Sequence, residues 1–196
     1  NIGIVGCGVI AFECLNFLKV IYPDLKQLKI MDISETRAGE FFDRCNSVFP
    51  DIKIEILKVA EAIIESADVI IISTTASQPF IEDIPPNCRK IILDISLRDL
   101  HPSIIKSSYN IVDDREHVCR AQTSIHLTLQ ESKSDDFISA TLGEILLNQA
   151  KVTGLEGKPI IFSPFGLGIL DLAVANYVME QAIEKQIGLH INNFAN

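Results

Sequence analysis

Short apolar runs rich in valine and isoleucine alternate with helical patterns as far as about residue 115. These runs contain few polar positions, which is typical of strands that are buried on both faces, as in a parallel sheet. The expected strands are Ile2–Val5, Leu28–Met31, Lys53–Leu57, Val69–Ser73, Lys90–Ile95 and Asn110–Val112, and the expected helices between them are Val9–Tyr22, Thr36–Asn46 and Ala60–Ser66. Strands that alternate with helices predict an α/β fold with an open, doubly wound, mainly parallel sheet.

The pattern changes near Glu116, where helical spacing becomes dominant. The expected helices are Glu116–Leu129, Ile138–Asn148 and Leu170–Ile187, with one further strand at Pro159–Phe162. We therefore divide the chain into a core of residues 1–115 and a helical completion of the same domain, residues 116–196, which adds C-terminal helices to the sheet.

Charge and cysteine content exclude several classes of function. Lys and Arg number 17 against 26 Asp and Glu, a formal net charge of −9, which disfavours nucleic acid and anionic membrane as partners. No apolar run approaches the roughly 18 residues of a membrane span. The cysteines (Cys7, Cys14, Cys45, Cys88 and Cys119) are odd in number and form no C-x-x-C pair, which favours free thiols in a reducing compartment and predicts a cytoplasmic protein.

A glycine-rich turn follows the first expected strand. The segment Gly6–Ala11 reads G-C-G-V-I-A and matches the pattern G-x-G-x-x-[GA] between a strand and a helix. Gly6 permits the tight turn, Gly8 lets the backbone approach a pyrophosphate, and the first N–H groups of the helix receive the anion. Asp32 lies about 20 residues further on, at the end of the second strand, where a carboxylate holds the ribose hydroxyls. The pattern predicts a Rossmann-type domain that prefers NAD to NADP.

Arg37 is the alternative to that preference, since an arginine five residues beyond Asp32 could bind a 2′-phosphate or simply lie in solvent on a helix face. The hydroxyl-rich segment Ser73–Ser77 follows the fourth strand, at the edge where open α/β sheets bind ligands. It could contact the cofactor or form an ordinary polar turn.

Asp94, Arg98 and Asp99 lie at or just beyond the end of the fifth strand. A carboxylate there could assist the attack of water on an imine, and an arginine could hold a substrate carboxylate in a bidentate manner. The alternative is a structural pair in which Arg98 and a carboxylate hold the loop in place. We take all three as candidate catalytic residues and leave that alternative open.

His117 and Cys119, with Asp113 and Asp114 nearby, raise the hypothesis of a metal site. A zinc site needs three or four ligands, and no second Cys/His cluster offers them. The two aspartates are better interpreted as carboxylates at the start of a helix, where the helix dipole favours negative charge. We expect no metal.

Three further strings make the chain more specific. They are Asp94–Pro102 (DISLRDLHP), Val112–Asp114 with His117–Ser124, and Ser163–Ala173 (SPFGLGILDLA). Together with Gly6–Ala11 and Ser73–Ser77, they resemble the ornithine cyclodeaminase/mu-crystallin family across essentially the whole chain. More narrowly, they are similar to the branch of that family that makes 2,3-diaminopropionate for siderophores and peptide antibiotics.

The resemblance implies an NAD-dependent oxidoreductase that oxidises a secondary amine of an amino-acid substrate. In this branch, N-((2S)-2-amino-2-carboxyethyl)-L-glutamate is cleaved to 2,3-diaminopropionate and 2-oxoglutarate. The residues implied to bind the cofactor are Gly6, Gly8, Val9 and Ile10 at the pyrophosphate, Asp32 at the ribose, Thr74, Thr75 and Ser77 at the middle, Ser96 and Leu97 at the nicotinamide end, and Gly166 in a loop that closes over that end.

The resemblance also implies a substrate-binding and dimerisation lobe ahead of the nucleotide domain, and a homodimer when full length. No residues precede Asn1 here, so we expect this chain alone to be inactive. Two alternatives remain open. One is another enzyme of the superfamily, an ornithine cyclodeaminase or a ketimine reductase, and the other is a non-catalytic NAD(P)-binding protein.

Overall fold

A computed structural model describes residues 1–85, 89–153, 155, 157–189 and 191, so Cys88 lies outside the described residues. The chain divides into two compact units, Asn1–Phe165 and Gly166–Asn196, and each is described by itself.

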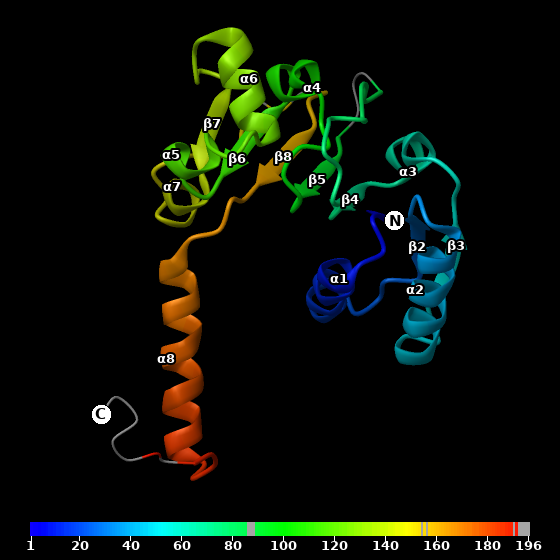
Figure 1. Ribbon diagram of the computed structural model, residues 1–196, viewed down its shortest axis with the longest axis vertical. Helices are drawn as coiled ribbons and strands as arrows, with labels where there is room; N and C mark the ends of the chain where they lie inside the picture. Colours follow the sequence, from blue (N-terminus) through cyan, green and yellow to red (C-terminus); the bar gives the residue numbers. More distant parts are fainter. Residues whose placement is uncertain (86–88, 154, 156, 190, 192–196) are drawn as a thin grey trace. The chain divides into compact units, whose positions relative to one another are not determined.

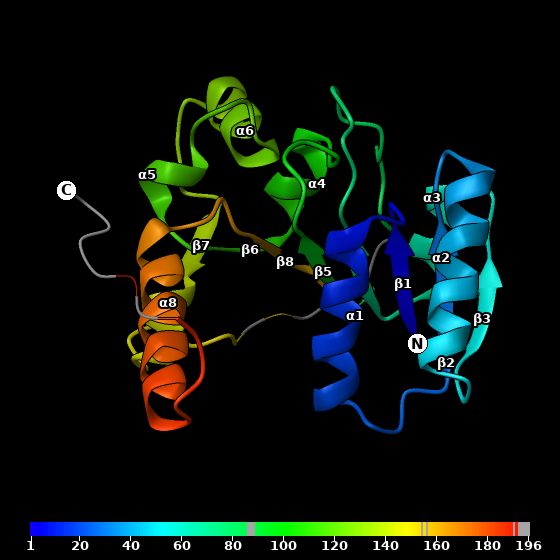
Figure 2. The same cartoon turned by 60° about the horizontal axis from the view of Figure 1, so that its bottom comes forward.

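The first unit contains an eight-stranded sheet in the part that the structure describes (Figures 1 and 2). The strands are β1 (Ile2–Val5), β2 (Gln27–Met31), β3 (Lys53–Ile56), β4 (Val69–Ile72), β5 (Ile91–Asp94), β6 (Tyr109–Val112), β7 (Ile138–Thr141) and β8 (Ile160–Ser163). Their order is β3-β2-β1-β4-β5-β8-β6-β7, and every pair of neighbours is parallel. From the β1/β4 pair the chain reaches β3 on one side and β7 on the other, and β8 then returns to lie between β5 and β6. This order confirms the predicted doubly wound α/β sheet.

Helices cover both faces of this sheet (Figure 2). The helices of the first unit are α1 (Val9–Ile21), α2 (Glu35–Val48), α3 (Ala60–Ser66), α4 (Pro102–Ser107), α5 (Arg115–Val118), α6 (Ser124–Ser132) and α7 (Leu142–Leu146). One buried cluster joins α1 and α2 to the sheet, and a second joins α3, α4 and α6 to the opposite face. The sheet is therefore the middle layer of three.

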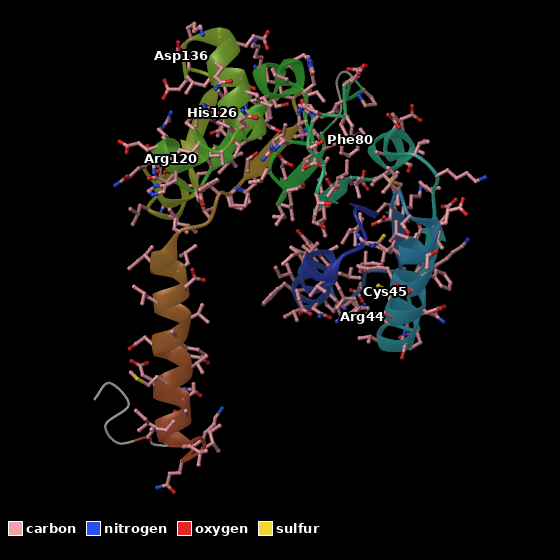
Figure 3. The ribbon with its side chains drawn as sticks, viewed as in Figure 1. Arg44, Cys45, Phe80, Arg120, His126 and Asp136 are labelled. Carbon is pink, nitrogen blue, oxygen red and sulfur yellow. The ribbon has the colours of Figure 1, made fainter. Side chains whose placement is uncertain are left out.

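The spacing of apolar residues explains how α1 and α2 pack. Phe12 of α1 and Phe41 of α2 are buried and meet edge to face, with ring centroids 6.1 Å apart. The guanidinium of Arg44 lies 3.5 Å from the centroid of the Phe12 ring, while Cys45 beside it in sequence is fully buried (Figure 3). Residues 41 and 45 share one helix face because they are four apart. This face fixes α2 against α1 above β1 and β2.

The predicted helix Glu116–Leu129 is wrong, because the structure has two helices there, α5 and α6. Ala121 and Gln122 between them have φ values of +53° and +54°, a left-handed backbone that no α-helix continues through. Thr123 then begins α6, since its hydroxyl accepts the backbone N–H of His126 at 3.0 Å. The apolar spacing runs across this break, which is why periodicity alone joined the two helices.

The predicted helix Ile138–Asn148 is also wrong in its first part. Residues 138–141 form β7, which pairs in parallel with β6, so Pro159–Phe162 is not the one strand beyond residue 115. Helix α7 begins after Thr141, whose side chain and that of Glu144 form a capping box. The T-x-x-E spacing was the available signal for this boundary. Helix α4 was not predicted at all.

The second unit contains α8 (Gly168–Glu184), which confirms the predicted C-terminal helix with shifted ends. None of its residues is buried, and apolar side chains lie on every side of it. The exposed large ones are Ile169, Leu170, Leu172, Val174, Tyr177, Val178, Met179 and Ile183. A helix that is apolar all round is typical of a helix covered by other protein. No helix among the described residues is long and apolar enough to cross a membrane.

Candidate nucleotide-binding site

The turn after β1 admits only glycine at Gly6. Its φ is +93°, and a Cβ built there would lie 2.5 Å from the carbonyl oxygen of Ser73. The Gly6 N–H donates to the carbonyl of Met31 at 2.8 Å, and the Gly6 carbonyl accepts the hydroxyl of Ser73 at 3.1 Å. The turn is therefore fixed between the ends of β2 and β4.

Gly8 leaves open space in front of α1. It is the N-cap of that helix, with no side-chain cap among the described residues, and beyond its chain neighbours no described heavy atom lies within 4 Å of where its Cβ would be. The first N–H groups of a helix have no partner within the helix and carry partial positive charge. Val9 and Ile10 at this helix start are 67% and 56% exposed. An uncapped helix start behind a bare backbone is suited to a pyrophosphate.

Asp32 follows β2 directly, as predicted, and supports the turn. One carboxylate oxygen accepts the N–H of Cys7 at 2.8 Å, and the other accepts the N–H of Ser34 at 2.8 Å. The side chain thus lies beside the glycine turn before any ribose is bound. Ile33 next to it is 96% exposed, and Arg37 is exposed on α2.

The loop after β4 lies against the same turn. Ser73 is bonded to Gly6, and the hydroxyl of Thr74 donates to the carboxylate of Asp99 and accepts the N–H of Ala76 at 3.0 Å. Thr75 and Ser77 are exposed. Of the three candidates in this loop, Thr75 and Ser77 thus present their side chains to solvent, whereas the hydroxyl of Thr74 already has two partners.

Asp94 and Asp99 are buried near the carboxyl end of β5, each 1% exposed. Burial, followed by the negative charge of Asp99, raises the pKa of Asp94 well above its usual range, and the hydroxyl of Ser163 opposes this rise. Oδ1 of Asp94 and Oδ2 of Asp99 have no hydrogen-bond partner among the described residues. The enclosed position of Asp94 thus favours the protonated form of its carboxyl group. Ser96 is half-buried and Leu97 is 40% exposed.

Arg98 holds a backbone carbonyl. Its Nη2 donates to the carbonyl of Ala121 at 3.1 Å, and no carboxylate of the described chain lies within ion-pair distance of it. The N–H of Ser124 donates to the carbonyl of Leu97 at 2.7 Å, and the Ser124 hydroxyl accepts the N–H of Leu100 at 3.2 Å, so the loop after β5 is also bonded to the first residue of α6. If Arg98 holds the loop in place, it does so by binding the Ala121 carbonyl and not by pairing with Asp94 or Asp99.

The candidate metal residues serve the backbone. Asp114 caps α5 by accepting the N–H of His117 at 2.8 Å, and this hydrogen bond lowers the pKa of Asp114, as expected for a carboxylate at a helix start. Asp113 accepts the N–H of Phe165 at 3.0 Å. Within the described ranges, no three His, Cys, Asp or Glu residues are grouped to hold a metal ion. Gly166 has a φ of +100° and belongs to the second unit, so its role at the cofactor stays a prediction.

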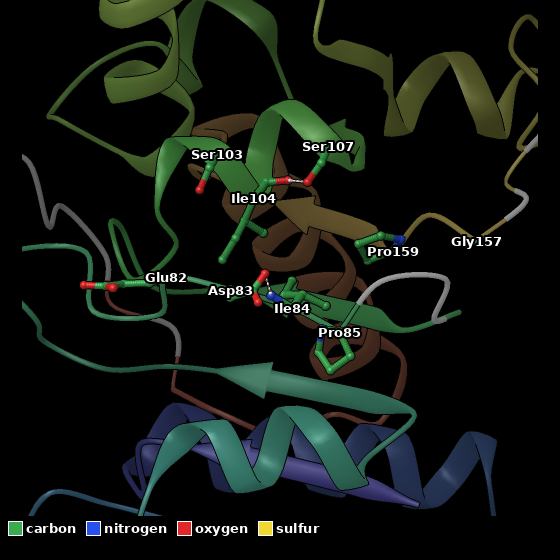
Figure 4. Close-up of a pocket in the computed structure, with 9 residues that line it drawn as sticks. All are labelled: Glu82, Asp83, Ile84, Pro85, Ser103, Ile104, Ser107, Gly157 and Pro159. Atoms are coloured by element: carbon green, nitrogen blue, oxygen red, sulfur yellow. Dashed lines mark hydrogen bonds between the residues drawn. The ribbon is translucent and has the colours of Figure 1, made fainter.

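Two cavities among the described residues lie towards the amino ends of the strands. One, of about 420 Å³, is lined by α4 residues with Pro159, directly before β8, and by the segment Glu82–Pro85 (Figure 4). Another, of about 570 Å³, is lined by Val69, Ile91 and Ile160, which are the first residues of β4, β5 and β8. Because the glycine turn lies at the carboxyl ends of the strands, these cavities are separate from it.

Comparison with known proteins agrees with this fold. A model of the ornithine cyclodeaminase/mu-crystallin family matches residues 1–186. The chain is 25% identical over 194 residues to N-((2S)-2-amino-2-carboxyethyl)-L-glutamate dehydrogenase of Staphylococcus aureus, covering 98% of this chain and 58% of that enzyme. It is 26% identical over 200 residues to the alanine dehydrogenase of Archaeoglobus fulgidus, covering 98% of this chain and 60% of that enzyme.

Solved structures show the same fold. An archaeal alanine dehydrogenase dimer with bound NAD superposes with a TM-score of 0.84 at 25% identity, covering 98% of this chain and 60% of that one. Thermococcus litoralis Δ1-pyrroline-2-carboxylate reductase in complex with NADH and L-proline gives a TM-score of 0.85 at 23% identity, covering 97% and 60%. The chain thus spans about three fifths of the length of these relatives.

The buried acid Asp94 predicts how stability depends on pH. Because the pKa of Asp94 is raised in the folded state, the folded protein binds more protons than the unfolded one between the two pKa values. As pH rises from the unfolded pKa of about 3.9 towards the folded pKa, the free energy of unfolding therefore falls by about 1.4 kcal/mol per pH unit. Asp94→Asn removes this loss, so the variant gains stability relative to wild type as pH rises above the unfolded pKa of about 3.9.

Urea unfolding followed by circular dichroism across this pH range measures the difference. The exposed Asp136→Asn serves as a control and keeps the wild-type dependence. Stability curves of Asp94→Asn and wild type that run parallel across the range contradict the prediction.

Proposed function

Since this chain belongs to the ornithine cyclodeaminase/mu-crystallin family, we propose that its glycine turn binds NAD. The observation that carries the proposal is the turn itself. Gly6 cannot bear a side chain, Gly8 leaves open space, and the start of α1 behind them is uncapped. These residues fit a dinucleotide, because the pyrophosphate needs close approach of bare backbone and free N–H groups. The NAD and NADH held by related structures support the same assignment.

Asp32 gives the site its preference for NAD in this proposal. Its carboxylate lies at the end of β2 beside the turn, where the adenosine ribose of a bound dinucleotide is placed in this kind of fold. A carboxylate accepts hydrogen bonds from ribose hydroxyls and repels a 2′-phosphate. The exposed Arg37 is the residue that would oppose this preference.

The activity that we propose for the whole protein is oxidative cleavage of N-((2S)-2-amino-2-carboxyethyl)-L-glutamate. NAD would accept a hydride from the carbon beside the secondary amine, which oxidises the amine to an imine. Hydrolysis of that imine by water would release 2,3-diaminopropionate and 2-oxoglutarate. The Staphylococcus aureus relative supports this substrate, as do the strings Asp94–Pro102 and Ser163–Ala173. Such a product would supply a siderophore or peptide-antibiotic pathway. The alanine dehydrogenase relative, at 26% identity, supports the alternative of another amino-acid enzyme of the superfamily.

Arg98 is the residue of the loop after β5 that we propose contacts the substrate. It is half-buried, whereas Asp94 and Asp99 are each 1% exposed and are thus removed from a bound molecule. Its planar guanidinium has donors beyond the Nη2 that holds Ala121, and such a group binds a carboxylate in a bidentate manner. We propose that Asp94, buried below this loop at the end of β5, influences the nicotinamide end of the site without touching the substrate.

We further propose a cytoplasmic homodimer for the full-length protein. Free thiols at Cys7, Cys14, Cys45 and Cys119 support a reducing compartment. The all-round apolar surface of α8 and the dimer of the archaeal relative support assembly. Because the chain spans about three fifths of its relatives, we propose that turnover needs the remaining part and that this chain alone gives none.

The cofactor proposal predicts a measurable difference between NAD and NADP. Titration of the purified chain, followed by calorimetry, should give tighter binding of NAD. Asp32→Ala should bring the two dissociation constants together, because it removes the charge that repels the 2′-phosphate. The ratio of the constants is the relevant readout, since Asp32 also holds the Cys7 N–H and its loss weakens both ligands.

Gly39→Ala, in α2, is a control that keeps both constants, because the new Cβ meets no described atom within 4 Å beyond its chain neighbours and the backbone of its own helix. NADP binding as tight as NAD binding would overturn the assignment of Asp32 and point to Arg37.

The substrate proposal predicts the effect of Arg98→Lys in the full-length enzyme. Lysine keeps the charge and loses the planar fork, so a bidentate clamp loses about 1.5–3 kcal/mol. The value of kcat/KM should therefore fall roughly ten- to a hundredfold, at about 1.4 kcal/mol per tenfold, while NAD affinity is unchanged. Production of NADH and 2-oxoglutarate measures this. Lost thermal stability with unchanged kinetics per folded molecule would assign Arg98 to the loop that holds Ala121.

A further inference from the structure

We propose that Asp99 is a positioning residue that holds Thr74, and with it the loop Ser73–Ser77, in the conformation that receives the middle of the dinucleotide. The proposal rests on NAD binding at the glycine turn and assigns to Asp99 a role through another residue instead of direct contact with substrate or cofactor.

The hydrogen bonds of Thr74 define the contact. The Thr74 hydroxyl donates to Oδ1 of Asp99. The Thr74 hydroxyl oxygen, Oγ1, also accepts the N–H of Ala76 at 3.0 Å, which closes a turn within the loop. A hydroxyl has one hydrogen to donate, so Thr74 has none left for a ligand. The Thr74 side chain is thus an internal support of the loop, and the exposed Thr75 and Ser77 are the side chains that face outward.

Asp99 is itself fixed by the backbone around it. Its carbonyl accepts the N–H of Phe80 at 3.1 Å and that of Ile81 at 3.0 Å, and Ile81 forms an isolated parallel bridge with Leu100. Phe80 can be followed in Figure 3 beside the strands that these loops extend. Asp99 therefore joins the loops after β4 and β5 in two ways. Its backbone carbonyl holds Phe80 and Ile81, and its carboxylate holds Thr74, which lies closer to the end of β4.

The near end of the β4 loop rests on the glycine turn. The Ser73 hydroxyl donates to the Gly6 carbonyl at 3.1 Å, and Cγ2 of Thr74 would lie 3.2 Å from a Cβ on Gly6. A shift of Thr74 is therefore transmitted to the turn on one side and to Ala76 on the other. Asp99 prevents that shift, because a hydrogen bond to a buried carboxylate is about twice as strong as one between neutral groups.

This arrangement separates the two halves of the ligand. In the proposed binding mode, the adenosine half of NAD would contact the turn and Asp32, which keep their own hydrogen bonds when Thr74 is released. The half that carries the nicotinamide would pass the loop after β4. Loss of the Thr74–Asp99 contact should therefore weaken binding of NAD and leave binding of ADP nearly unchanged.

The test compares Thr74→Val, which keeps the shape and removes the hydroxyl, with Thr74→Ser, which keeps the hydroxyl. Calorimetric titration of the chain with NAD and with ADP gives both constants for each variant. Thr74→Val should bind NAD about tenfold more weakly, as expected if only about a tenth of the molecules hold the loop correctly. Thr74→Ser should bind NAD within about twofold of wild type, and all variants should bind ADP within about twofold of wild type.

Thr128→Val is the matched control. Thr128 is also buried, and its hydroxyl donates to the Ser124 carbonyl at 2.7 Å inside α6, away from the turn. It should lose stability and keep NAD affinity, so a general loss of stability is distinguished from a loss of position.

Asp99→Asn completes the test. Its neutral amide oxygen is a weaker acceptor, so it should weaken NAD binding in the same direction, and the double variant with Thr74→Val should bind no more weakly than Thr74→Val alone. Unchanged NAD affinity in Thr74→Val, equal losses for NAD and ADP, or multiplying losses in the double variant would each overturn the role of Asp99. Failure of the wild-type chain to bind NAD would instead overturn the proposed function.

Discussion

The backbone at Gly6 is the constraint on which the candidate site depends. Its φ of +93° and the 2.5 Å between its absent Cβ and the Ser73 carbonyl leave room for no side chain. The same residue bonds to Met31 and to Ser73, so the ends of β1, β2 and β4 are brought together at one point. In an open α/β sheet, ligands bind at the carboxyl ends of the strands. The loops that would contact a ligand here are therefore positioned relative to Gly6.

Hydrogen bonds from three short side chains fix the other loops at the carboxyl edge of the sheet. Asp32 holds the Cys7 N–H, Ser73 holds the Gly6 carbonyl, and Asp99 holds Thr74, and each bond joins residues that are at least 25 apart in sequence. The loops of the carboxyl edge are thus arranged before a ligand arrives, and a ligand does not have to order them. The cavities at the amino edge, where Glu82–Pro85 meets α4, belong to no proposed step.

The parts that local chemistry decides could be predicted from the sequence. The Val/Ile runs marked β1, β4 and β5 to within two residues at their ends, since strands buried on both faces have few polar positions. Gly6–Ala11 and Asp32 were found because a dinucleotide needs those residue types in that order. Strand β7 was missed because its conformation is decided by pairing with β6, and the break at Ala121 because caps, not apolar spacing, decide it.

The burial of the candidate catalytic residues could not be read from spacing. Asp94 ends β5, and Arg98 and Asp99 lie in the loop that follows, yet the two carboxylates are enclosed and the arginine reaches the Ala121 carbonyl. The bond between Asp99 and Thr74 depends on the order of β4 and β5 in the sheet, which no local pattern encodes. Sequence patterns thus point to the carboxyl edge of the sheet as the candidate site, and three-dimensional contacts supply the observations from which roles within it are proposed.

The central claim is that the carboxyl edge around Gly6 is where NAD binds, and amide chemical shifts test it most directly. Titration of the isotopically labelled chain with NAD, followed by two-dimensional NMR, reports every backbone N–H separately. We expect the largest shifts in residues 6–10, 32–34 and 73–77, with residues 82–85 and 103–107 of the amino-edge cavity unchanged. Shifts that gather at that cavity, or no shifts at saturating NAD, would contradict the account.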